Sequence, residues 1–433
     1  MIPVLYEHQK KALALTAKHN RCAYYLDMGL GKTFVGTEKM ISLGARYNLL
    51  VCQKSKVQDW VEHFRKYTDL TVFDATSTKK DEKRSYEYGF WMNYRNGAKE
   101  VPSVIVINYD LLWRRPEIAT LEHFTLMLDE SSLIQNHAAK RTKFVLKLQP
   151  ENVILLSGTP TSGRCERLWT QMHLLGWPIS RRLYEQTYVI WDQLQIPGMQ
   201  YPIRVPRGYK NVDRLKSKMA EHGCVFMKTE ECFDLPDQQD ITIRVDPSAE
   251  YAKFMRHRYA CLKDGTELAG STALTMRLYA RQLCGQYNRA KLSAMEDLIE
   301  STEDRLLVFY NFNAELAELK SICRDRPLSV VNGATKDLRA YESKSDSITL
   351  IQYQAGAYGL NLQKARQVVY FTPPESSELY EQSRKRIHRI GQNRRCLYYH
   401  LQCSGSIEDK IMKALKERKD YTDELFKKDY YRD

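Results

Sequence analysis

The sequence predicts an α/β protein with two parallel-sheet lobes in tandem and a helical inserted protrusion between them. Three observations support this fold class. Short apolar runs alternate with amphipathic stretches, as they do in parallel sheets covered by helices. These runs form two series, separated by a segment of different composition. The length of 433 residues exceeds what one ordinary core accommodates, so we expect two or three domains.

The first series of apolar runs predicts the sheet of an N-terminal lobe at residues 1–176. Amphipathic patterns at 32–44 and 55–67 predict helices between the strands. The strands themselves are expected at residues 22–26, 48–52, 103–108, 124–129 and 152–157.

The second series predicts a C-terminal lobe at residues 301–433. Between the lobes, residues 177–300 are expected to form an irregular and helical insertion. This insertion starts with a basic, proline-dotted stretch at 177–235 and continues with helices near 248–263 and 274–300. Strands of the second lobe are expected at residues 305–310, 328–332, 347–353, 367–371 and 396–401.

Composition and charge limit the classes of function. No apolar stretch approaches the roughly 20 residues that span a bilayer, so no membrane partner is expected. The ten cysteines include no C-x-x-C pair and no metal-site spacing, and the chain starts without a signal-peptide pattern. Reduced thiols and a cytoplasmic location are therefore expected. The net charge of +13 favours a polyanionic partner such as nucleic acid, although membrane surfaces and simple solubility are alternatives.

The stretch "DMGLGKT" at residues 27–33 follows an expected strand and opens an expected helix. This is the context of a phosphate-binding loop, although the usual template has a glycine where this chain has Leu26. Gly29 and Gly31 allow a tight turn whose amides face phosphate, Lys32 would reach the β- and γ-phosphates, and Thr33 would hold Mg²⁺. The alternative is a strand–helix turn that contains Gly-Lys-Thr by chance.

An acidic pair ends the expected strand at 124–129. Asp129 would lie near a metal ion and Glu130 near an attacking water molecule. Alone this pattern is weak, because acidic residues often cap helices after strands. One strand later comes "LLSGTP" at 155–160, which on its own is compatible with an ordinary turn.

A basic segment of the second lobe, "EQSRKRIHRIGQ" at 381–392, contains two arginines three residues apart. On a helix, Arg386 and Arg389 share one face and can point into a cleft together. Arginines placed this way stabilise charge on a transferring phosphoryl group. The alternative is a solvated basic helix or a patch that binds nucleic-acid backbone.

Taken together, the motifs resemble those of the Snf-type, Swi/Snf-like ATPases of helicase superfamily two, which include chromatin remodellers and other duplex-DNA translocases. The resemblance runs from about Tyr6 to the last helix, nearly the whole chain. It rests on nine segments in the family's order: "LYEHQKKAL", "DMGLGKT", "VQDWVEHFRKY", "VIVINYDLL", "LDESSLIQN", "LSGTPTSGRCERLW", "LVFYNF", "GAYGLNLQKA" and "QSRKRIHRIGQ".

This resemblance implies two RecA-like lobes with ATP bound between them, Mg²⁺ as the metal, and a C-terminal brace helix. Ser157, Gly158 and Thr159 would link hydrolysis to lobe movement. The implied catalytic residues are Lys32, Glu130, Arg386 and Arg389, and the implied metal ligands are Thr33 and Asp129. The implied nucleotide-binding residues are Gln9, which would recognise adenine, and Met28, Gly29, Leu30, Gly31, Lys32, Thr33, Gly359 and Gln382.

The resemblance also implies a nucleic-acid partner, most of all double-stranded DNA bound through its backbone. For each residue the alternative is a solvated surface charge. The expected DNA-binding residues are Lys54, Lys56, Asn108, Tyr109, Arg141, Lys143 and Asn361, with Lys140, Arg181, Arg182, Arg204 and Arg207 as further candidates.

Some positions depart from the family pattern. Ser132 stands where the family usually has a histidine that helps to couple the lobes, so coupling is expected to differ while hydrolysis is retained. The first-lobe "P-x-S-L" becomes "QKSK", and "YFTPPES" lacks the family's tryptophan. The short form resembles phage and prophage members, so we expect a monomer in a bacterial or phage-infected cytoplasm.

Three functions are compatible with these motifs. The first is an ATP-dependent translocase on double-stranded DNA that acts on protein–DNA complexes or branched DNA. The second is a helicase that separates DNA or RNA strands, with a wedge within residues 177–235. The third is a DNA-binding module that does not hydrolyse ATP, which the intact Lys32, Glu130 and Arg389 disfavour.

Overall fold

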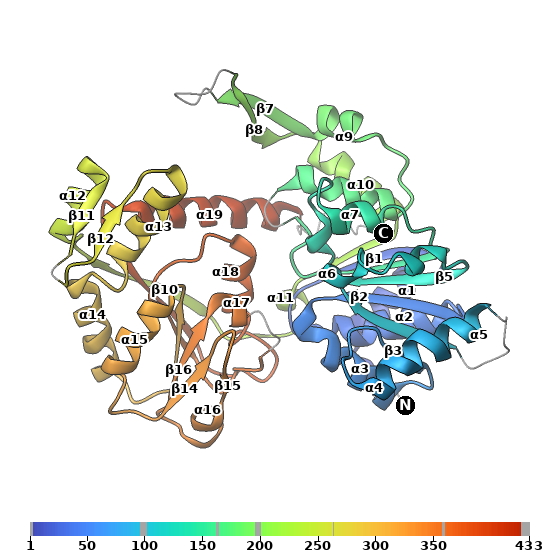
Figure 1. Cartoon of the computed structure of the whole chain (residues 1–433), viewed down its shortest axis with the longest axis horizontal. Coiled ribbons are helices and arrows are strands. Elements are labelled where there is room, and N and C mark those ends of the chain that lie inside the picture. The colour runs from blue at the N-terminus through green and yellow to red at the C-terminus, as the bar shows by residue number, and fades with distance from the viewer. Residues whose placement is uncertain are drawn as a thin grey trace. The chain divides into compact units, whose positions relative to one another are not determined.

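The computed structural model describes residues 3–95, 102–161, 164–194, 201–262, 264–356 and 360–425. The chain divides into two compact units (Figure 1). The first comprises residues 1–232 together with 421–433, and the second comprises residues 233–420. No helix among the described residues is both long and apolar enough to cross a membrane.

A seven-stranded parallel sheet forms the centre of the first unit, in the order β3-β4-β2-β5-β6-β1-β9. The interior strands are buried almost throughout, as expected for a parallel sheet covered on both faces. The strands are β1 (Arg21–Leu26), β2 (Tyr47–Cys52), β3 (Thr71–Asp74), β4 (Ser103–Asn108), β5 (Phe124–Asp129), β6 (Asn152–Leu156) and β9 (Cys224–Met227).

Helix α2 packs unusually close to this sheet. A Cβ atom at Gly36 would lie 2.9 Å from both the Leu156 and Met127 side chains, so a larger residue there would force them to shift. This contact places the start of α2 beside the ends of β5 and β6. The helices of the unit are α1 (Glu7–Leu15), α2 (Lys32–Ser42), α3 (Val57–Tyr67), α4 (Lys80–Arg84), α5 (Trp91–Arg95), α6 (Tyr109–Leu112), α7 (Lys140–Val145), α8 (Trp169–Leu174), α9 (Arg181–Tyr188), α10 (Val212–Glu221) and α11 (Thr229–Cys232).

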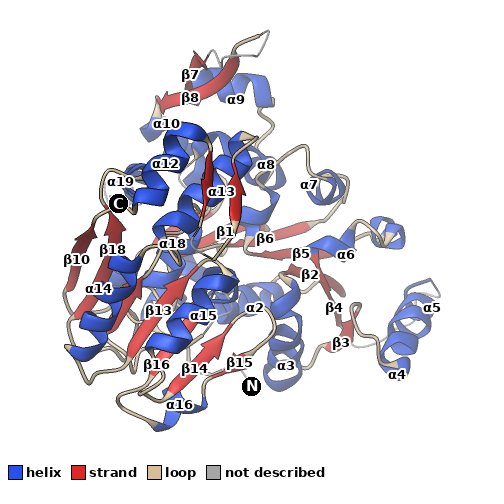
Figure 2. Ribbon diagram, turned by 60° about the vertical axis from the view of Figure 1, so that its left-hand side comes forward, coloured by secondary structure: helices blue, strands red, loops and turns tan. Residues whose placement is uncertain are grey.

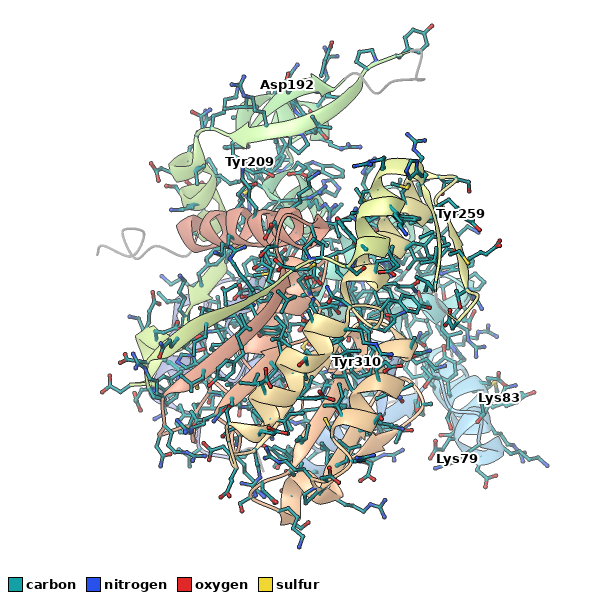
Figure 3. The ribbon with its side chains drawn as sticks, turned by 90° about the vertical axis from the view of Figure 1, so that its left-hand side faces the viewer. Lys79, Lys83, Asp192, Tyr209, Tyr259 and Tyr310 are labelled. Atoms are coloured by element: carbon teal, nitrogen blue, oxygen red, sulfur yellow. The ribbon has the colours of Figure 1, made fainter. Side chains whose placement is uncertain are left out.

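Two parts of the first unit extend from its sheet. An antiparallel hairpin of β7 (Val189–Leu194) and β8 (Ile203–Tyr209) projects beyond α9 and α10 (Figure 1). The segment that contains α4 carries Lys79 and Lys83 on its outer side (Figure 3). Both lysines are more than half exposed.

The second unit is built on another seven-stranded sheet, in the order β10-β18-β17-β13-β16-β14-β15. All neighbours are parallel except β14 and β15. Its strands are β10 (Gln238–Val245), β13 (Leu306–Tyr310), β14 (Leu328–Val331), β15 (Lys336–Asp337), β16 (Ile348–Gln352), β17 (Gln367–Tyr370) and β18 (Cys396–Cys403).

Side chains of β13 alternate between two hydrophobic clusters, one on each face of the second sheet. Helices α14 and α15 cover one face (Figure 2), where their apolar residues join Tyr310. The remaining elements are α12 (Ala249–His257), the hairpin β11 (Tyr259–Cys261) with β12 (Glu267–Ala269), α13 (Ala273–Cys284), α14 (Arg289–Glu300), α15 (Asn313–Ile322), α16 (Arg339–Ser343), α17 (Tyr353–Gly356), α18 (Ser377–Arg384) and α19 (Ile407–Leu425).

The predicted fold class of two parallel-sheet lobes with helices is confirmed. Residues 177–300 were expected to span the junction of the two lobes. Within them, β9 joins the first sheet and β10 joins the second. The helix expected at 248–263 ends at His257, since Arg258 takes a left-handed φ of 58° and the chain continues into β11.

Candidate nucleotide-binding site

The loop between β1 and α2 has the backbone of a phosphate-binding loop. Gly29 and Gly31 take φ values of 92° and 75°, which an L side chain rarely adopts. Helix α2 starts at Lys32, and its N-cap residue Gly31 has no side chain to occupy the first amides. The helix N-terminus therefore presents free amide positions and the positive end of its dipole, as anion binding requires.

Lys32 is fixed at the carboxyl end of β1. Its Nζ donates hydrogen bonds to the carbonyl oxygens of Leu26 at 2.9 Å and Asp27 at 3.3 Å. A Cβ atom at Gly158 would lie 3.4 Å from this Nζ and equally close to the Met28 side chain. The ammonium group therefore lies between the phosphate-binding loop and the Ser-Gly-Thr segment.

Gln9 of α1 lies against the same loop and is 4% exposed. Its Nε2 donates to the Leu30 carbonyl at 3.1 Å, and its Oε1 accepts from the Tyr6 amide at 2.9 Å. A Cβ atom at Gly31 would come within 2.2 Å of this Nε2. Close approach of Gln9 is thus a second reason for glycine at position 31.

The acidic pair lies at the end of β5. The Trp60 indole donates to Asp129 Oδ2 at 2.8 Å, and the Tyr109 hydroxyl donates to the Asp129 carbonyl at 2.9 Å. Burial raises the pKa of Asp129, whereas the hydrogen bond from Trp60 and the charge of Lys32 lower it. Burial is the larger effect, so the pKa of Asp129 stays raised, and the other two effects oppose part of that shift.

Glu130 is connected to the Ser-Gly-Thr segment. It takes a left-handed φ of 52°, which turns its side chain out of the line of the strand. Its Oε2 accepts a hydrogen bond from Ser157 Oγ at 3.4 Å, and the same Oγ accepts from the Thr159 amide at 3.2 Å. Glu130 is therefore in physical contact with Ser157, the first residue of the segment expected to link hydrolysis to lobe movement.

Gln171 of α8 belongs to this network and was missed by the sequence analysis. Its Oε1 accepts hydrogen bonds from Ser131 at 2.8 Å and Tyr25 at 3.0 Å, and its Nε2 donates to the Pro160 carbonyl at 2.9 Å. The side chain is fully buried. A glutamine in a helix gives no local signal of such a role, because only the fold brings it to Ser131, the residue that follows the acidic pair.

The oxygen donors of the site suit Mg²⁺. Thr33 offers a hydroxyl and Asp129 a carboxylate, the ligand types that this cation prefers. Across the described ranges, no group of three or more His, Cys, Asp or Glu side chains could hold a metal ion. This small donor set fits an ion that takes most of its ligands from phosphate oxygens and water.

In the second unit, two predicted segments form one hydrogen-bonded platform. Arg389 Nη1 donates to Asn361 Oδ1 at 2.6 Å, and the Leu362 amide donates to the Arg386 carbonyl at 3.3 Å. Gln392 Nε2 donates to the Ala365 carbonyl at 2.8 Å. Residues 360–365 and 386–392 are therefore held together. Gly359, expected to bind nucleotide, lies outside the described residues.

The expectation of one helical face for Arg386 and Arg389 is wrong. Helix α18 ends at Arg384, and both arginines lie in the turns that follow. Arg386 is 1% exposed, whereas Arg389 is half-buried and has its pKa lowered by burial. Gln382 remains on α18, where its Nε2 donates to Glu378 at 3.3 Å. The two arginines therefore differ in environment despite their spacing.

Arg384, which the sequence analysis did not select, fixes the end of α18 to β10. Its guanidinium donates to both oxygens of Asp240, at 2.5 and 3.1 Å, and stacks over the Tyr398 ring at 3.8 Å. His400 also contacts Asp240, at 2.9 Å. This cluster anchors the helix from which Arg386 and Arg389 continue.

The expected DNA-binding residues divide by exposure. Asn108 and Tyr109 are only 3% and 2% exposed. Their side chains are therefore buried inside the protein, and the prediction that they contact the DNA backbone is wrong. Lys54 is exposed, and Lys56 is half-buried with its Nζ 2.8 Å from Asp59. The other candidates have solvent-accessible side chains: Lys140, Arg141, Lys143, Arg181, Arg182, Arg204, Arg207 and Asn361.

Comparison with known proteins decides the family. The SNF2-related domain matches residues 8–299, which is more than half of the chain. The chain belongs to the SNF2-related family. Its second part, residues 290–391, matches the helicase conserved C-terminal domain. This pair of domains makes the SNF2-related chain an ATPase of helicase superfamily two.

Individual relatives are distant from the SNF2-related chain. It is 24% identical to SWI/SNF-related matrix-associated actin-dependent regulator of chromatin subfamily A-like protein 1 of Xenopus tropicalis, over 90% of this chain and 42% of that protein. It is 21% identical to the ISWI chromatin-remodeling complex ATPase ISW1 of Saccharomyces cerevisiae, over 90% of this chain and 37% of that protein. The chain thus spans about two fifths of the length of such relatives.

Among solved structures, the SNF2-related chain is similar to the SWI2/SNF2 ATPase core of Sulfolobus solfataricus in complex with dsDNA. The two chains are 18% identical with a TM-score of 0.45, and the match covers 99% of this chain and 94% of the other.

Proposed function

We propose that the protein is a DNA-stimulated ATPase that translocates on double-stranded DNA. The observation that carries this proposal is the single site formed within the first unit. There Lys32 lies beside Gly158, and Glu130 bonds Ser157 of the same segment. Phosphate-binding and acidic groups are thereby connected to residues 157–159, the loop that would link ATP hydrolysis to movement of the lobes.

Each residue has a role that its position supports. The amides around Gly29 and Gly31 and the dipole of α2 bind the phosphates, and the Lys32 ammonium leaves its carbonyl partners for the β- and γ-phosphates. Glu130 accepts a proton from the attacking water molecule. Mg²⁺, held by Thr33 and Asp129, would neutralise charge that develops on the phosphate oxygens.

Arg386 and Arg389 are proposed as the arginines that stabilise charge on the transferring phosphoryl group. Arg389 supports this role better, because it is half-buried and its Nη1 donates to a neutral amide oxygen, Oδ1 of Asn361. Burial also increases the strength of its electrostatic interactions. Gln9 and Gln382 are proposed to contact the nucleotide, Gln9 through adenine.

Double-stranded DNA is proposed as the partner because basic side chains are exposed on several elements of the first unit. They occupy the turn before α3, helix α7 and the β7–β8 hairpin. The chain's net charge of +13 supports a polyanionic partner as well. Binding through phosphates predicts little dependence on sequence.

The test compares ATP turnover with duplex DNA, single-stranded DNA and RNA, followed by triplex displacement and fork unwinding. Stimulation by duplex and displacement of a triplex strand without unwinding supports translocation. Stimulation by RNA alone contradicts the DNA proposal. Absence of turnover under every condition supports a module that binds DNA without hydrolysis.

Strand separation is a second candidate function, favoured by the β7–β8 hairpin. The hairpin is antiparallel, projects from the first unit, and stacks Arg204 over Trp191 at 4.2 Å. An aromatic and a cation on a projecting ribbon could insert at a fork. Unwinding of a fork by the wild type, lost in Trp191→Ala with retained ATPase, would select this function.

A further inference from the structure

Helix α3 contacts both halves of the candidate phosphate site. Through Trp60 it reaches the carboxylate of Asp129, as described above. Through His63 it reaches α2, because His63 Nε2 lies 3.0 Å from Thr37 Oγ1. Both side chains are almost fully buried, at 3% and 9% exposure. One helix therefore touches the acidic strand and the helix of the phosphate-binding loop.

The two partners of the Thr37 hydroxyl determine which nitrogen of His63 carries the proton. Its hydroxyl has one proton, which it donates to the Thr33 carbonyl at 2.8 Å. It must then accept from His63, so His63 carries its proton on Nε2. Burial lowers the pKa of His63 to about 4, which keeps the ring neutral and preserves this arrangement. The contact extends from α3 to the backbone of Thr33.

Aromatic rings pack α3 against α2. Trp60 stacks on Phe64 at 5.4 Å, and Phe34 of α2 meets the edges of His63 at 5.0 Å and Tyr67 at 5.4 Å. Close-packed side chains transmit a displacement because they leave little free volume.

The N-terminal end of α3 carries basic residues. The single turn Lys54–Lys56 precedes it directly, and Lys56 Nζ bonds Asp59 Oδ2 at 2.8 Å. Asp59 is 62% exposed and is the residue before Trp60. A phosphate that binds Lys56 competes with Asp59 for the same ammonium, so it changes the electrostatic environment one residue from the indole.

We propose that α3 couples nucleic-acid contact at Lys54–Lys56 to the Asp129 carboxylate, with Trp60 as the positioning residue. This inference rests on the proposed DNA-stimulated hydrolysis. The indole N–H fixes Oδ2 of Asp129, one of the two residues proposed to hold Mg²⁺. Without that bond the carboxylate can rotate, and a buried anion loses one of its donors.

The alternative is that Trp60 only packs in the hydrophobic core. The variant Trp60→Phe distinguishes packing from hydrogen bonding, since it keeps an aromatic ring and removes the N–H donor. The control is Trp169→Phe, because Trp169 Nε1 also donates a 2.8 Å hydrogen bond in this unit, to the Ile179 carbonyl. A packing role predicts similar behaviour for the two variants.

Three quantities are measured on the full chain. They are the Mg²⁺ concentration for half-maximal binding of a fluorescent ATP analogue, the affinity for duplex DNA, and the ratio of kcat with and without duplex. For Trp60→Phe we expect duplex affinity within about twofold of wild type, a Mg²⁺ requirement at least about fivefold higher, and a kcat ratio at least about fivefold lower. Trp169→Phe should match the wild type in all three.

A second variant avoids any risk to folding. Asp59→Asn removes the exposed partner of Lys56, and Glu62→Gln on the exposed side of α3 is its control. Coupling predicts that Asp59→Asn lowers the kcat ratio at saturating duplex at least about twofold without weaker DNA binding. Glu62→Gln should leave the ratio unchanged.

Two results would overturn the inference. One is an unchanged Mg²⁺ requirement and kcat ratio in Trp60→Phe, and the other is an unchanged ratio in Asp59→Asn if Trp60→Phe does not fold. Failure of the proposed function looks different, because then the wild type itself shows no stimulation by duplex. The Mg²⁺-dependent binding comparison still tests the role of Trp60 in that case.

Discussion

At the scale of single residues, Lys32 has the most defined position in the candidate site. Its ammonium is bonded to two backbone carbonyls and lies beside Gly158. We expect Lys32→Ala to weaken binding of a fluorescent ATP analogue at least about tenfold, because a charge-assisted contact to phosphate is lost. The control Lys79→Ala changes a lysine that is 79% exposed on the same unit, and it should bind as the wild type does.

Glu130 has a separable role. We expect Glu130→Gln to bind ATP normally and to lower kcat by about 100-fold or more, the range for loss of a general base. Single-turnover hydrolysis and equilibrium nucleotide binding are the measurements. Glu122→Gln, an exposed acid in the same unit, is the control. Equal losses of binding and turnover in Glu130→Gln would contradict a role in the chemical step.

His63 makes stability depend on pH. Burial lowers its pKa to about 4 in the folded chain, below the value of about 6.5 for an unfolded one. Between these values the unfolded state binds more protons, so the contribution of His63 to stability is present above pH 6.5 and is lost as the pH falls towards 4. Urea unfolding of His63→Gln should show a weaker pH dependence across this window than the wild type. An identical dependence would mean that other groups cause the loss.

Local chemistry explains which site residues could be predicted. Gly29, Gly31, Lys32 and the acidic pair follow from strand, loop and helix signals within a few positions. Trp60 could not be predicted, since a tryptophan on an amphipathic helix gives the same pattern whether it fills a core or donates to Asp129. Only the tertiary fold distinguishes these possibilities.

At the scale of elements, α18 depends on its bond to β10. We expect Asp240→Asn to lower the free energy of unfolding by about 1–3 kcal/mol, because the buried Arg384 guanidinium loses a charged partner. Urea denaturation is the measurement. In the control Asp337→Asn, the broken pair involves Arg339, which is 91% exposed, so the free energy of unfolding should stay close to that of the wild type. If both variants lowered the free energy of unfolding by the same amount, the burial of Arg384 would not strengthen its ion pair with Asp240.

Interior and edge strands differ in how well the sequence predicts them. All ten expected strands are present within one or two residues, since interior strands are continuous apolar runs. The short strands β3 and β9 and the outer strand β10 were not predicted. β10 alternates between exposed and half-buried residues, so it lacks the apolar run that marks an interior strand.

At the scale of the whole molecule, the net charge of +13 predicts how DNA binding responds to salt. Affinity for duplex should fall at least about tenfold between about 50 and 200 mM salt as counterions are released. Replacing Lys54 and Lys56 by alanine should reduce the slope of log K against log salt by roughly 2. The control replaces Lys79 and Lys83, the exposed lysines of the α4 segment (Figure 3), and should keep the slope. An unchanged slope without Lys54 and Lys56 would remove them from the DNA contact.

The limits of the two units could not be predicted from composition. The change to proline-dotted sequence after residue 176 indicates a boundary, but the first sheet needs β9 to cover the side of β1. Such pairing between strands far apart along the chain leaves no local pattern. The expected monomer, the cellular compartment and a phage origin stay predictions.

The pairing of β9 with β1 has a consequence for biosynthesis. During translation, β1 acquires its last neighbour only after residues 224–227 have left the ribosome. Until then β1 is an open edge of apolar residues, which invites pairing with other chains. A fragment cut at residue 176 would carry that edge permanently and should aggregate, whereas one that continues through residue 232 covers it.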